Sequence, residues 1–156
     1  ALFAGLLFVL HCIRLYGWYS RGIWSKTLVW ILYVGYAWIV FGFLLKVLSI
    51  THGISVFLAI HSFAYGGIGM ITIGMMARVA LGHTGRNVFD PPGILKTSFI
   101  FMFVGTIVRV IFPLINMDNY ALWIGFAQVL WILAFAIILT VYLPMLIKAR
   151  VDGKPG

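Results

Sequence analysis

The side chains best suited to chemistry in this sequence are imidazoles and sulfurs. The sequence has a single cysteine, Cys12, and four histidines: His11, His52, His61 and His83. Imidazole binds haem iron and copper, and thiolate or thioether sulfur favours Cu(I). His61 and Arg109 stand inside long apolar stretches, where an ionisable side chain is costly and is therefore a functional candidate. There is no glutamate and no Cys-x-x-Cys-His haem-attachment motif, so a carboxylate proton relay or a covalently attached haem is not expected.

The overall composition requires a membrane around these residues. Of the 156 residues, 63% are hydrophobic and only 9% are charged. A soluble domain carries about 25% charged residues, because water must cover its surface. This composition excludes a soluble enzyme, a secreted disulfide scaffold and a disordered chain.

The net charge of +8 results from 11 lysines and arginines against three acidic residues. These cations stand between the apolar runs, as expected for loops at a membrane surface. We therefore expect the lipid bilayer, and no nucleic acid, as a partner of the basic residues.

Four apolar runs are long enough to cross a bilayer, which takes about 20 helical residues. They cover roughly 27–50, 52–81, 93–115 and 119–147, and a fifth run, 1–16, resembles the end of a span whose start is missing. Asp90-Pro91-Pro92-Gly93 separates two of them, because proline interrupts a helix. The sequence predicts a single all-α domain over 1–156, a polytopic membrane bundle of about five segments with the first truncated.

The positions of the cations predict the orientation. Lysines and arginines cluster around 17–26, around 82–92 and in the tail, whereas the connections near Thr51 and at 116–119 contain none. Because positive loops remain on the cytoplasmic side, we place these three basic regions, including the C-terminus, in the cytoplasm.

The third span has an unusual composition. It contains an interior His61 and the glycines Gly66, Gly67 and Gly69, and it continues into the run Gly74 to Arg86, GMMARVALGHTGR. This run, the preceding histidine and glycines, and the tail RVDGKPG from Arg150 to Gly156 resemble the NnrS family. The resemblance implies a multi-pass protein of the bacterial inner membrane that contains haem and copper. It also implies a role in nitric oxide handling, denitrification and protection against nitrosative stress.

Members of that family are usually more than twice as long, with about twelve spans, so the sequence resembles their C-terminal part. On a continuous helix, His61 would lie ~13 Å from His52 and face the opposite side, so the two could not hold one metal. His83 would lie ~33 Å from His61 along the axis. A second axial ligand is therefore expected from the N-terminal half, another subunit or a non-histidine side chain.

We expect a b-type haem near the extracytoplasmic side, with His61 as ligand. Arg109 would neutralise a propionate ~9 Å below that edge, and Gln128 lies at a similar predicted depth. Gly66, Gly67 and Gly69 would give the ligand room. The alternative is a buried histidine hydrogen-bonded to a neighbouring helix, with the glycines serving helix packing.

A copper site is a second expectation, at the cytoplasmic edge. Its candidate ligands have the same predicted depth in the membrane, and each offers a sulfur atom or an imidazole, which suit Cu(I). They are His11, Cys12, Met75, Met76 and His83. The alternative is that the sulfur side chains only pack against lipid or protein.

Arg78 and Arg86 flank a tight turn bracketed by Gly82 and Gly85. This turn could bind an anion through guanidinium and backbone N–H groups, or its arginines could anchor the helix end at anionic head groups. Two other functions stay open: a transporter or channel lined by the third span, Arg109 and Gln128, and a structural subunit of a respiratory complex.

Overall fold

The computed structural model describes residues 1–153, and all regular structure in that range is helical, which confirms the all-α prediction. The elements are α1 (Leu2–Gly17), η1 (Arg21–Ile23), α2 (Thr27–Thr51), α3 (Val56–His61), η2 (Ser62–Gly69), α4 (Met70–His83), α5 (Leu95–Thr106), η3 (Ile107–Ile111), α6 (Phe112–Ile115) and α7 (Tyr120–Leu146). Four helical runs are long and apolar enough to cross a membrane: Thr27–Thr51, Val56–His83, Leu95–Ile115 and Tyr120–Leu146. The apolar α1 has 16 residues and is shorter than these four.

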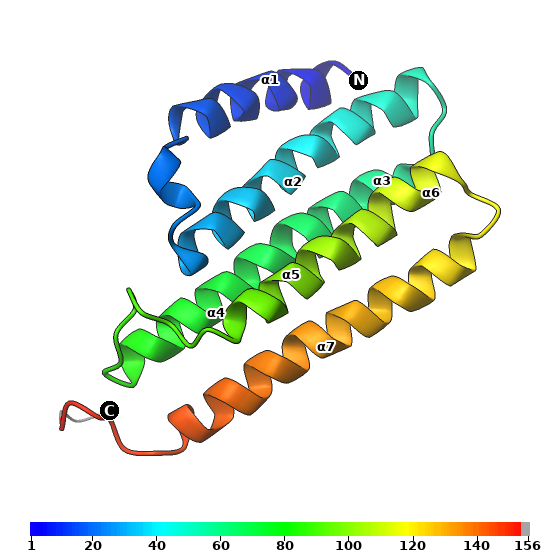
Figure 1. The fold of residues 1–156 in the computed structure, drawn as a ribbon. Helices are drawn as coiled ribbons and strands as arrows, with labels where there is room; N and C mark the ends of the chain where they lie inside the picture. The colour runs from blue at the N-terminus through cyan, green and yellow to red at the C-terminus, as the bar shows by residue number, and fades with distance from the viewer. Residues whose placement is uncertain (154–156) are drawn as a thin grey trace.

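The helices lie side by side and alternate in direction (Figure 1). Helix α1 packs along α2 at one edge, α7 forms the other edge, and the α3–η2–α4 and α5–η3–α6 runs lie between them. We call the end with residues 18–26, 84–94 and 147–153 the basic end, and the end with residues 52–55 and 116–119 the opposite end. The opposite end contains no lysine or arginine in its connections.

The third span begins at Val56, four residues later than the pattern predicts. His52 caps the end of α2, and Gly53 has a φ of +69°, a left-handed conformation that glycine adopts without steric cost. The assumption of a continuous helix from His52 to His61 is therefore wrong. His61 is the sixth residue of its helix, ~8 Å from the helix start rather than ~13 Å.

Two membrane-length helices change to wider π-helical turns, in η2 and in η3. Proline explains the second. Pro113 lacks the N–H that would bond the carbonyl four residues earlier, at Arg109, and its ring crowds that carbonyl. Segments of π-helix occur frequently at functional sites. Here η2 follows His61 directly, and η3 contains Arg109.

The glycines of η2 allow close contact with α2 and α5. A Cβ atom at Gly66 would lie 2.7 Å from Thr106 Cγ2 and 2.8 Å from Trp38 Cβ. Ile39 fills the space beside Gly67 in the same way. Small residues at helix contacts are what membrane helices use to pack closely.

Replacing Gly66 with alanine should destabilise the bundle by about 1–3 kcal/mol, because the added methyl group overlaps the α2 and α5 contacts. Thermal denaturation in detergent measures the effect. Gly125 on α7 is the matched control, since nothing lies within 4 Å of a Cβ built there. Gly125→Ala should leave stability unchanged or raise it by up to about 1 kcal/mol; equal losses at both positions would contradict the packing role.

Candidate functional site

The most distinctive polar contact inside the bundle joins His61 to Arg109, near the opposite end. The Nδ1 atom of His61 lies 2.6 Å from the carbonyl oxygen of Phe57. Because a carbonyl only accepts, Nδ1 must carry the proton. Nε2 of the neutral ring then has a free lone pair, and Nη2 of Arg109 donates to it at 2.6 Å.

The Arg109 guanidinium lacks a full set of hydrogen-bond partners. It lies 5.4 Å from the ring centre of Tyr120, and its Nη1 is buried without a hydrogen-bond partner. Within residues 1–153, the ion pair joins Arg150 to Asp152. No described carboxylate oxygen therefore lies within 4 Å of the Arg109 guanidinium nitrogens. Arg109 is half-buried, and a buried cationic nitrogen without an anion is costly. The site is therefore suited to an anionic or strongly accepting group from outside the described residues.

Tyr65 connects this region to the last helix. It lies one turn beyond His61, and its hydroxyl donates to the Ala127 carbonyl at 2.6 Å. Gly105 makes this possible, because a Cβ there would overlap the Tyr65 hydroxyl. Sequence reasoning missed Tyr65 and also Tyr120, although a tyrosine inside a glycine-rich span was a usable signal.

The other predicted members of the haem site are arranged differently. Gln128 follows Ala127 but is exposed, and in the described part of the chain its side chain makes no hydrogen bond. The space beside Gly66, Gly67 and Gly69 is occupied by Trp38, Ile39 and Met102 respectively. In this structure these glycines serve helix contacts, while His61 itself is half-buried.

The predicted copper ligands lie on two separate helices. His11 does not lie at the basic end: its ring bonds the Tyr36 hydroxyl and stacks on Phe43, well inside α2. The predicted shared depth is wrong because α1 packs antiparallel along α2. His11 therefore lies beside Tyr36 and Phe43, in the middle of α2, and Cys12 is the next residue of α1.

The remaining copper candidates lie on α4. Met75 and His83 line one cavity with Arg78 and Phe89, whereas Met76 lines another against α7. Within residues 1–153 no group of three or more histidine, cysteine or acidic side chains could hold a metal. The structure therefore does not bring the five candidate ligands together.

The Gly82–Arg86 turn contacts the tail. Gly85 has a φ of +72°, Nη1 of Arg150 donates to the His83 carbonyl at 3.0 Å, and the Val151 N–H donates to the Thr84 carbonyl at 3.2 Å. Hydrogen bonding to the Asp152 carboxylate raises the pKa of Arg150 above its ordinary value. The tail thus forms hydrogen bonds to two backbone carbonyls of this turn. The tail beyond residue 153, including Lys154, lies outside the described residues.

A bundle of apolar, membrane-length helices with an imidazole–guanidinium pair inside one end defines a polytopic membrane protein with a polar intramembrane site. A family model described as NnrS protein matches residues 1–150. The chain belongs to the NnrS family, as the sequence resemblance predicts. No curated protein and no solved structure gave a match to the chain.

Proposed function

We propose that this chain is part of a haem-binding protein of the bacterial inner membrane that responds to nitric oxide and protects against nitrosative stress. Membership of the NnrS family supports the proposal. In it, His61 would hold the haem iron and the basic end would face the cytoplasm, in agreement with the positive-inside rule.

The observation that carries the proposal is the hydrogen bond between His61 Nδ1 and the Phe57 carbonyl. Metal-ligating histidines generally donate their other ring N–H to a carbonyl or carboxylate, which fixes the ring and leaves one nitrogen for the metal. The Nδ1 contact with the Phe57 carbonyl provides this arrangement. A bound haem would supply an iron centre for binding nitric oxide or transferring electrons.

The positive charge of Arg109 suits the negatively charged propionates of a haem. Nε2 has one lone pair, which accepts the Arg109 Nη2 hydrogen bond in this structure, so the same lone pair would serve either Arg109 or an iron. The buried, unpartnered Nη1 then makes Arg109 suited to a propionate carboxylate. His11 packs on Tyr36 and Phe43, His52 bonds Thr51, and His83 ends α4. A second ligand would therefore come from the N-terminal half of the same protein, from another subunit or from a non-histidine side chain.

Copper does not fit the residues expected to hold it. His11 and Cys12 lie on α1, and Met75, Met76 and His83 lie on α4 and line two different cavities. The proposal therefore assigns no copper site to this set. The metal analysis described next includes copper for the whole protein.

The test is an optical spectrum with metal analysis of the whole purified protein. We expect a Soret band, iron in a stoichiometric amount, and a spectral change when the reduced protein is exposed to nitric oxide. A colourless, iron-free protein would contradict haem binding and favour a transporter. A colourless protein that purifies only with cytochrome partners would favour a structural subunit.

A further inference from the structure

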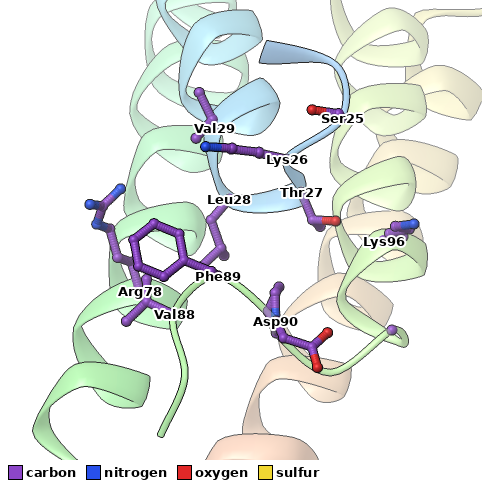
Figure 2. A pocket seen from close by; sticks show the side chains of 12 residues that line it. Ser25, Lys26, Thr27, Leu28, Val29, Arg78, Val88, Phe89, Asp90 and Lys96 are labelled. Carbon is purple, nitrogen blue, oxygen red and sulfur yellow. The ribbon is translucent and has the colours of Figure 1, made fainter. Parts of the chain in front are cut away.

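A second polar feature lies at the basic end, far along the helices from His61. It is a cavity of about 480 Å³ between the start of α2, the last turns of α4, the segment 88–93 and the start of α5 (Figure 2). Segments that are distant in the sequence therefore meet around one space. A volume of this size is within the ~300–1,000 Å³ range of small-ligand sites.

Cations from three of these segments line the cavity. They are Lys26 before α2, Arg78 on α4 and Lys96 on α5. The lining also contains one carboxylate, Asp90, so the formal charge of the lining is +2. In the described residues, the ion pair joins Arg150 to Asp152, outside this cavity. None of the three cations therefore has a described carboxylate oxygen within 4 Å. Within residues 1–153, the positive charges of the lining therefore exceed its negative charge by two.

The cavity also has groups that orient a ligand. The ammonium nitrogen of Lys26 lies 5.8 Å from the ring centre of Phe89, and Figure 2 shows Lys26 and Arg78 beside that ring. Thr27 adds a hydroxyl to the lining. The first turn of the 25-residue helix α2 points its N–H groups and the positive end of its dipole toward this region, which adds to the attraction for an anion.

We propose that this cavity binds a phosphate group, carried either by an anionic lipid headgroup or by a small solute. Figure 2 shows Lys26 and Arg78 on one side of the lining and Lys96 on the other. A phosphate group accepts charge-assisted hydrogen bonds from both lysine and arginine. The residues that line the cavity stand at or near the ends of membrane-length helices, and lipid headgroups surround the ends of helices that span a bilayer. The proposal does not depend on haem binding at His61.

The test compares two double variants of the whole protein that lose the same charge. Lys26→Gln with Lys96→Gln changes the cavity, whereas Arg21→Gln with Lys148→Gln removes two exposed cations of the same end that do not line it. Native mass spectrometry measures bound phosphatidylglycerol against phosphatidylcholine, and equilibrium dialysis with radiolabelled inorganic phosphate measures the free anion. Circular dichroism and gel filtration report folding.

We expect the cavity variant to bind phosphatidylglycerol about tenfold more weakly, equivalent to about 1.4 kcal/mol, and the control to bind as the parent does. A loss confined to inorganic phosphate would support the proposal with a soluble ligand. Equal losses in both variants, or no loss in either, would overturn it, because the cations would then act only as a diffuse surface charge. If the double variant does not fold, Lys96→Gln against Lys148→Gln gives the same comparison.

Discussion

Replacement of His61 by alanine is expected to remove the Soret band of the whole protein, or to reduce its haem content at least about tenfold, equivalent to about 1.4 kcal/mol. The reason is the arrangement of the ring: Nδ1 is held by the Phe57 carbonyl, and Nε2 has the ring's one available lone pair, which accepts a hydrogen bond from Arg109 in this structure. Removing the imidazole removes that ligand. Optical spectra and iron analysis of the purified variant give the readout.

A structural role for His61 must be separated from ligation. His61→Ala also leaves the Arg109 Nη2 without its acceptor, which costs about 1–3 kcal/mol when the group is buried. Added imidazole should therefore restore a Soret band if the lost group was a ligand, whereas a protein that is merely unfolded cannot respond. The control is His52→Ala, since His52 is exposed beside Thr51. An unchanged spectrum in His61→Ala would refute the assignment.

Replacement of Arg109 by methionine is expected to have opposite effects on stability and on haem retention. Methionine is a shorter, flexible and uncharged side chain. It removes a half-buried guanidinium that has a buried, unpartnered Nη1 and no described carboxylate within 4 Å. Replacing a poorly paired buried charge with an apolar side chain often stabilises a protein by about 1–4 kcal/mol. The loss of the hydrogen bond to His61 offsets part of this gain, so we expect a net rise of about 1 kcal/mol.

Haem retention should fall in the same variant, because a propionate loses its cation. A fall of about tenfold or more corresponds to the loss of a charge-assisted hydrogen bond of about 1.5–3 kcal/mol. Thermal denaturation and haem dissociation, measured on the same preparation, separate the two effects. Lys46→Met, at another half-buried cation within an apolar span, is the control. Stronger haem retention in Arg109→Met would mean that Arg109 only competes for Nε2 and does not hold a propionate.

Several features of the fold were predictable because they follow from the period and length of apolar runs. The helices after Pro92 and near Asn119 begin close to their predicted positions, since proline and polar residues interrupt apolar runs visibly. The start of the third span was misplaced, because a single left-handed Gly53 ends the preceding helix without a change in hydropathy. The two π-helical segments were not predicted, because hydropathy does not report a change in hydrogen-bond register.

The site was predictable only in part. His61 and Arg109 stood out because ionisable residues inside apolar spans are rare, but their contact depends on how two helices pack. His11 was misplaced because its depth depends on how α1 docks against α2, which brings its ring to Tyr36 and Phe43. Tyr65 was missed because its role arises from Gly105 and from a carbonyl on a third helix.

The sequence by itself determined that this protein belongs in a membrane, is built of helices and carries a family signature, because composition, apolar length and a long motif are properties of the chain alone. Only the tertiary structure decided which polar residues meet. It paired His61 with Arg109, separated the expected copper ligands, and gathered Lys26, Arg78 and Lys96 around one cavity. The physical reason is that contacts between helices depend on their rotation and docking, which small residues, turns and π-segments set and which hydropathy does not encode.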